Sequence, residues 1–128
     1  MNGTGSGDFP IWDFRETAGH VTGSDLVGFH VEAVDGSIGK VDRLSDLVED
    51  SYLVVDTGPW VFGRLVLLPA GTVLRVDQAD RKVYVDRTKS EIKHAPPLVP
   101  DFHEQETAAA NRDRYTAYYG PFYGNPVR

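Results

Sequence analysis

Alternating apolar and polar residues predict a series of short β-strands through the middle of the chain. Turn signals separate these runs, and Asp35-Gly36 is the clearest, because this pair tolerates the positive φ that a two-residue hairpin loop requires. Short strands with regular turns are typical of a sandwich or a barrel, and closing a barrel removes exposed strand edges. We therefore expect a mainly β fold, a closed barrel of about six short strands. The predicted strands are residues 29–34, 37–44, 52–56, 64–69, 72–76 and 82–85.

Two helices are predicted after the strands. Thr88-Lys-Ser-Glu91 matches a capping box, so a short helix should begin there, reach about His94 and end before Pro96-Pro97. Residues 104–119 hold good helix formers with acids near the start, and Gly120-Pro121 should end this second helix. The acidic stretch at 46–50 reads as a surface turn at a strand end.

The same pattern divides the chain into three parts. Residues 1–23 form an N-terminal extension that is flexible at its Gly/Ser/Thr-rich start. Its aromatic segment, Phe9 to Phe14, should dock on the domain or on a partner, because clustered aromatic residues are costly to leave in water. Residues 24–98 form the compact β domain, and residues 99–128 form the C-terminal helix and a Tyr-rich tail.

Aromatic residues outside the strands are the candidate interface residues. In the Thr57–Phe62 connection, Trp60 and Phe62 either plug one end of the barrel or form an anchor for a partner. The helix tyrosines lie three and four residues apart and share a face, which either folds back over the barrel or pairs in a homo-oligomer. We favour self-association as a homodimer or higher oligomer. The candidates are Trp12, Trp60, Phe62, Tyr115, Tyr118, Tyr119, Phe122 and Tyr123.

Composition narrows the classes of function. The formal net charge is −6, with 19 acids against 13 bases, so a surface that follows nucleic-acid phosphates is not expected. The absence of cysteine excludes disulfides, thiolate zinc sites and cysteine nucleophiles. No apolar run is long enough to span a membrane, and the first residues lack the features of a signal peptide, so we expect a cytoplasmic protein.

Candidate chemistry is sparse. His103, Glu104 and Glu106 form the densest cluster, but only His103 and Glu106 have a helical spacing that suits a metal, and acids are common in a first turn. The serines have turn or cap explanations, and none lies in a Gly-x-Ser-x-Gly elbow. We therefore expect no catalytic residues, no metal and no cofactor.

Five segments, in order, resemble the PRC-barrel domain, which is named after the cytoplasmic part of the photosynthetic reaction-centre H subunit. The resemblance covers residues 24–98 and implies a small barrel. It also implies a non-enzymatic module that docks onto a protein or ribonucleoprotein partner. The matching segments are Asp35–Val41, Tyr52–Gly58, Leu67–Pro69, Val83–Asp86 and Thr88–Pro96.

Several functions remain open at this point. We favour an interaction module that self-associates and docks onto a protein partner whose identity the sequence does not give. The resemblance also suggests an adaptor in ribosome or RNA–protein assembly, or a soluble relative of the H subunit linked to photosynthetic electron transport. A sensor of a small molecule or metal is a further class, and a ligand-dependent rise in melting temperature would reveal it.

Overall fold

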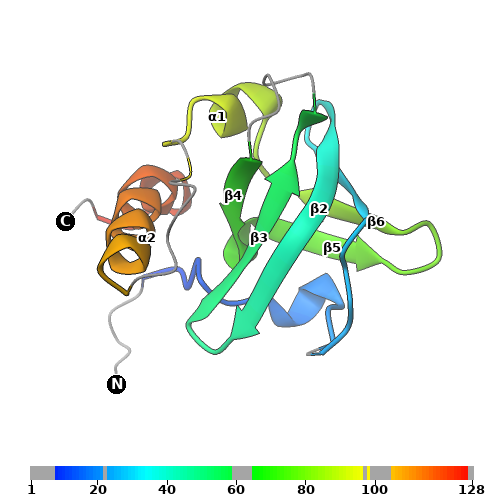
Figure 1. The fold of residues 1–128 in the computed structure, drawn as a ribbon, viewed down its shortest axis with the longest axis horizontal. Helices are drawn as coiled ribbons and strands as arrows, with labels where there is room; N and C mark the ends of the chain where they lie inside the picture. The colour runs from blue at the N-terminus through cyan, green and yellow to red at the C-terminus, as the bar shows by residue number, and fades with distance from the viewer. Residues whose placement is uncertain (1–7, 22, 59–64, 97, 99–104, 127–128) are drawn as a thin grey trace.

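A computed structural model describes residues 8–21, 23–58, 65–96, 98 and 105–126, with backbone alone for 105–111. Its strands form one six-stranded sheet in the order β4-β3-β2-β1-β6-β5 (Figure 1). The strands are β1 His30–Ala33, β2 Gly36–Leu47, β3 Asp50–Asp56, β4 Leu65–Pro69, β5 Val73–Asp77 and β6 Lys82–Val85. The helices are η1 Glu16–Ala18, η3 Ala70–Thr72, α1 Lys89–Lys93, α2 Gln105–Tyr119 and η4 Gly120–Tyr123.

The six predicted strands are confirmed, and so is the mainly β fold. All pairs are antiparallel except β1 and β6, which run parallel and join the two halves of the sheet. The β2–β3 hairpin is longer than predicted, because its turn contains only Val48 and Glu49. Two serine side chains extend the pairing to the tip, where Ser45 Oγ donates to Asp50 O and Ser51 Oγ donates to Leu47 O, both at 2.8 Å.

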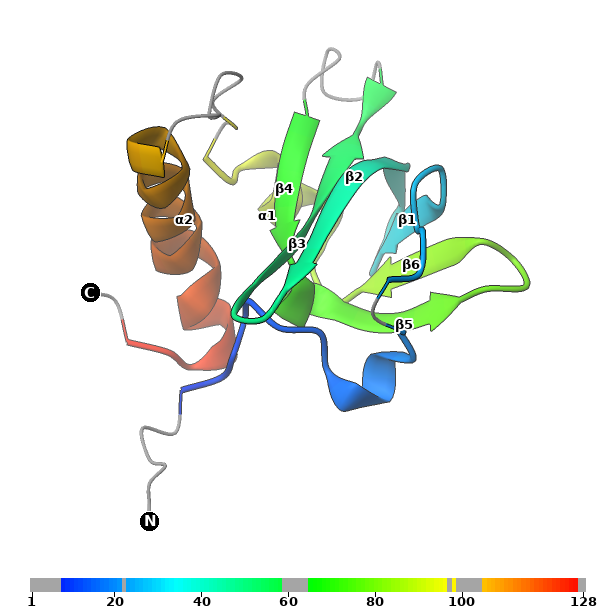
Figure 2. The ribbon, with the colours of Figure 1, turned by 60° about the horizontal axis from the view of Figure 1, so that its bottom comes forward.

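The sheet curls but does not close, so the prediction of a closed barrel is wrong for the described strands. Its two edge strands, β4 and β5, follow each other in the chain and are joined by the short helix η3 instead of by a ladder. Other parts of the chain lie beside these edges. α2 packs against β4, and η1 packs against β5 (Figure 2). Covering an edge protects its unpaired backbone groups, as closure would.

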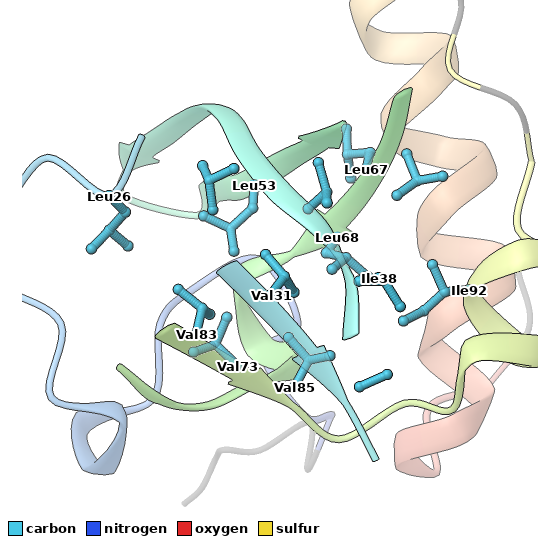
Figure 3. Packing of buried hydrophobic residues seen from close by; sticks show 14 of the residues in the cluster. Leu26, Val31, Ile38, Leu53, Leu67, Leu68, Val73, Val83, Val85 and Ile92 are labelled. Carbon is cyan, nitrogen blue, oxygen red and sulfur yellow. The ribbon is translucent and has the colours of Figure 1, made fainter. Parts of the chain in front are cut away.

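The hydrophobic core lies inside the curl. Val31, Leu53, Leu68 and Val83 have no exposed surface, and Figure 3 shows their side chains gathered between the strands. Because successive side chains in a strand point to opposite faces, this alternation places one apolar row per strand toward the inside. Ile92 of α1 completes the same cluster from the helical side.

Both predicted helices are present. At the start of α1, Thr88 Oγ1 accepts from Glu91 N at 3.1 Å and Glu91 Oε1 accepts from Thr88 N at 2.9 Å. This reciprocal pair is the capping box that the sequence indicates. α2 ends at Tyr119, and Gly124 takes a left-handed conformation at the end of η4.

The N-terminal segment crosses the corner between β4 and β5. Gly71 N donates to Ile11 O at 2.7 Å, and Ser51 N donates to Trp12 O at 2.8 Å. A Cβ atom on Gly71 would lie 2.6 Å from the Ile11 Cα atom, which is closer than real Cβ contacts allow. The crossing therefore requires glycine at this position.

We expect Gly71→Ala to lower the free energy of unfolding by about 2–3 kcal/mol, because backbone must move to admit the methyl group. Urea denaturation measures this loss, and hydrogen exchange of the Ser51 amide should become faster. Gly23→Ala is the matched control: Gly23 has a positive φ of 89° but no atom within 4 Å of its Cβ position. It should cost about 1 kcal/mol and leave Ser51 exchange unchanged. Unchanged Ser51 exchange in Gly71→Ala would contradict the crossing.

Candidate interaction surface

The helix tyrosines lie against the chain's own barrel. Tyr115 and Tyr119 are fully buried in the core cluster. Tyr115 Oη donates to Pro96 O at 2.7 Å, and Tyr118 Oη donates to the Glu91 carbonyl at 2.5 Å. These contacts join α2 to α1, which is the folded-back arrangement of the tyrosine face.

The aromatic tail meets the N-terminal segment around one carboxylate. The Tyr123 ring stacks on Phe9 with centroids 4.7 Å apart, and its hydroxyl donates to Asp86 Oδ1 at 2.5 Å. Arg15 Nη2 binds Asp86 Oδ2 at 2.5 Å. Asn125 bonds both backbone groups of Phe9, accepting from its N–H at 2.7 Å and donating to its carbonyl at 2.8 Å. We call these five residues the aromatic clasp.

The other candidates differ in placement. Trp12 is buried, its Nε1 donates to Thr116 Oγ1 at 2.8 Å, and the Arg112 guanidinium lies 5.3 Å from its ring centroid. Phe122 is the most exposed of the described candidates, at 37%, and lies beneath Arg87. Trp60 and Phe62 lie outside the described residues. The described aromatic candidates thus fasten the two terminal segments to the barrel, and their role as an interface stays a prediction.

The two most exposed apolar side chains lie elsewhere, in a stretch that the sequence analysis interprets only as a surface turn. Leu47 is 67% exposed and Val48 85% exposed, both at the end of the β2–β3 hairpin. We call residues 46–50 the hairpin tip. Two adjacent apolar residues between acids, at the end of a strand and in its hairpin turn, were the sequence signal for it, because turns normally hold polar residues or glycine.

Two other segments hold the hairpin tip in place. Asp13 Oδ1 accepts from Glu49 N at 2.7 Å, and Arg112 Nη2 donates to Glu49 O at 2.6 Å. The Arg112 guanidinium also lies 3.7 Å from the Asp50 carboxylate. Glu49 itself has a left-handed φ of 61°. The tip is therefore bonded to the N-terminal segment and to α2, in addition to its own strands.

The Asp46 side chain contacts a segment of the chain that contains another exposed apolar residue, Val21. Its carboxylate accepts from Gly23 N at 2.9 Å and lies 3.4 Å from His20 Nε2. The Gly23 hydrogen bond is the main cause that holds the pKa of Asp46 below its usual range. Val21, between these two contacts in the chain, is 66% exposed. We call the hairpin tip, together with Val21 in the segment that contacts Asp46, the interaction surface.

This surface is acidic. Four carboxylates, from Asp13, Asp46, Glu49 and Asp50, surround the apolar tip, and Arg112 is the cation bonded to it. The side chain of His20 is only 2% exposed and does not contribute to the outer surface. The arrangement combines protruding apolar groups with a negative rim, which suits recognition of another macromolecule more than chemistry on a small substrate.

Other kinds of site have little support in the described part of the chain. Among those residues, no group of three His, Asp or Glu side chains is placed to hold a metal ion. The helices described there are also too short or too polar to cross a membrane. In the cluster of His103, Glu104 and Glu106, which we did not expect to bind a metal, the first two residues lie outside the described part and Glu106 is described by its backbone alone.

A curled six-stranded sheet with a parallel junction between two antiparallel halves defines a small barrel-like fold. The family model for the PRC-barrel domain matches residues 19–92, more than half of the chain. The chain belongs to the PRC-barrel family.

One solved structure similar to this chain is RimM from Pseudomonas aeruginosa, named as a 16S ribosomal RNA processing protein. The two are 28% identical with a TM-score of 0.43, over 51% of this chain and 42% of that protein. This chain therefore spans less than half the length of RimM. A search of curated proteins gives no match.

The aromatic clasp predicts a stability change at high pH. Burial, then the hydrogen bond to Asp86, raise the pKa of Tyr123 well above its usual value of about 10. The folded chain keeps this proton when the unfolded chain loses it, so the stabilisation is complete below about pH 10 and is lost as pH rises further.

We expect Tyr123→Phe to lower the free energy of unfolding by about 1–2 kcal/mol at neutral pH and to make the decline above pH 10 shallower. Melting temperatures between about pH 8 and 11 measure both effects. Part of the decline should remain, because the pKa values of Tyr52 and Tyr118 are also raised by burial. Tyr84→Phe, on the outer face of the sheet, is the control. Equal pH profiles for wild type and Tyr123→Phe would refute the clasp.

Proposed function

We propose that this PRC-barrel chain is a non-enzymatic interaction module that docks onto a protein partner through the hairpin tip. The observation that carries the proposal is the exposure of Leu47 and Val48 on a hairpin that side chains from two other segments hold in place. A turn whose only task was to connect two strands would not need apolar residues facing water.

The energetics of the tip favour docking. Burying a Leu or Val side chain at an interface contributes about 1.5–3 kcal/mol, so the pair supplies a useful share of a moderate affinity. Because Asp13 and Arg112 already order the turn, little conformational entropy is lost on binding. The resemblance of the chain to non-enzymatic docking modules supports the same function.

The self-association expected from the aromatic tail stays a prediction. Tyr115 and Tyr119 have no exposed area to offer a second copy, and Tyr123 is engaged with Phe9 and Asp86. Removing the C-terminal helix would also uncover core residues, so truncation is a poor test of oligomerisation. The roles in ribosome assembly and in electron transport, and the cytoplasmic location, stay predictions.

Site-specific photo-crosslinking in the native cell tests the docking function. A photoreactive amino acid at position 48 should crosslink to a defined protein, and the control is the same amino acid at position 34. Val34 is 65% exposed in the turn between β1 and β2, away from the tip. Leu47→Ser should reduce the position-48 product several-fold. Equal products from positions 34 and 48, or no loss with Leu47→Ser, would refute the tip as a docking site.

A further inference from the structure

We propose that the partner of the hairpin tip is a protein surface with an apolar pocket bordered by lysine or arginine side chains, and that Glu49 selects this partner. The inference rests on the proposed docking function of the tip and adds the chemistry of the partner. Leu47 and Val48 supply the exposed apolar groups, and the charges around them decide which kind of surface can approach.

The hairpin tip carries an excess of negative charge. It contains the carboxylates of Asp46, Glu49 and Asp50, and the carboxylate of Asp13 is hydrogen-bonded to it. Arg112 is the cation that bonds to the tip, through Glu49 O at 2.6 Å and the Asp50 carboxylate at 3.7 Å. Four carboxylates thus stand against one guanidinium, so the exposed apolar pair has a negative rim.

Neighbouring charges do not cancel this excess. Asp42 and Arg43, the next charged residues along β2, bind each other at 3.2 Å and together add no net charge. His20 lies near Asp46, and counting it as charged would still leave more carboxylates than cations. The whole chain has a formal net charge of −6, so its more distant field has the same sign. Such a surface attracts cationic groups and repels anionic ones.

Glu49 places a free carboxylate beside Val48. Its backbone N–H and C=O are bound by Asp13 and Arg112, at 2.7 and 2.6 Å, so the position of the residue is fixed. Its side chain is exposed, and within the described part of the chain no hydrogen bond or ion pair engages its carboxylate. A cationic group of a partner can therefore pair with it without breaking a contact in this chain.

The residue type at position 49 is not the one that the turn favours. Its φ of 61° lies in the left-handed region, which glycine and asparagine adopt at lower cost than glutamate. No ion pair or hydrogen bond of the Glu49 side chain with the described residues offsets that cost. A side chain kept at a site that costs stability is expected where the side chain serves binding.

The same charges argue against other occupants of the tip. Nucleic-acid phosphates and anionic lipid headgroups have the sign of the rim, and a second copy of the chain brings a further net charge of −6. A cationic protein surface complements both parts of the tip. Lysine and arginine pair with carboxylates, and their alkyl stems pack against apolar groups such as Leu47 and Val48.

Photo-crosslinking from position 48 in the native cell, followed by mass spectrometry of the crosslinked peptide, tests this partner chemistry. The captured segment should contain Lys or Arg within a few residues of the crosslinked site. Glu49→Gln removes the charge and keeps the size, and it should reduce the product about 3-fold. Glu49→Lys reverses the charge and should reduce the product about 10-fold.

Asp80→Asn is the matched control. It removes one negative charge from an exposed position in the turn between β5 and β6, on the opposite side of the molecule from the hairpin tip (Figure 1). The crosslinked product should stay unchanged in this variant. Melting temperatures check that every variant is folded.

Glu49→Gly separates binding from folding. Glycine adopts the left-handed conformation without strain, so the melting temperature should rise by about 2 °C. The crosslinked product should nevertheless fall as it does in Glu49→Gln. A residue whose role was only structural would not lower the product while the fold became more stable.

The outcomes distinguish this inference from the docking function. A product that Glu49→Gln leaves unchanged, a captured segment without Lys or Arg, or a product with the mass of two copies would overturn the inference and leave docking in place. A lipid or nucleic-acid adduct, or equal products from positions 34 and 48, would refute docking onto a protein partner and the inference with it.

Discussion

The crossing of the N-terminal segment over the corner between β4 and β5 is the contact on which the rest of the structure depends. It rests on two backbone hydrogen bonds, from Gly71 to Ile11 and from Ser51 to Trp12, and on the missing side chain of Gly71. Because the sheet curls without closing, its edges need cover. After the crossing, residues 16–18 pack against edge strand β5. At the crossing itself, the Trp12 side chain hydrogen-bonds to α2, and α2 covers the other edge strand, β4.

The same constraint links stability to function. Asp13 follows the crossing directly and holds Glu49, while Arg112 of α2 holds the same turn from the other side. The segments that cover the sheet edges therefore also order the hairpin tip. In this arrangement the terminal segments belong to the folded unit, and the aromatic residues that a linear reading assigns to partners mostly join parts of one chain. Leu47 and Val48 are the apolar side chains that stay exposed at the tip.

How well the sequence predicted each feature depended on how local its cause is. The capping box at Thr88 and Glu91 and the alternation of Lys82 to Val85 arise within a few residues, and both are present as predicted. The length of the β2–β3 hairpin was underestimated, because the bonds of Ser45 and Ser51 across the turn leave no mark in hydrophobic periodicity. The closed barrel was wrong because closure depends on how strands far apart in the chain are placed. For Tyr115 the sequence left two interpretations open, a face packed on the barrel or a face paired with a second copy. Helical spacing shows which residues share a face but not what that face contacts.

By itself, the sequence determined the mainly β fold, the strands, the helix caps, the PRC-barrel family and a net negative charge. These follow from periodicity, turn chemistry, motif order and composition, which are properties of neighbouring residues or of the whole chain. Only the tertiary structure decided that the sheet stays open, that the tyrosine face turns inward and that Leu47 and Val48 protrude. Those features arise from contacts between residues such as Asp13 and Glu49, or Phe9 and Asn125, whose separation along the chain carries no local pattern.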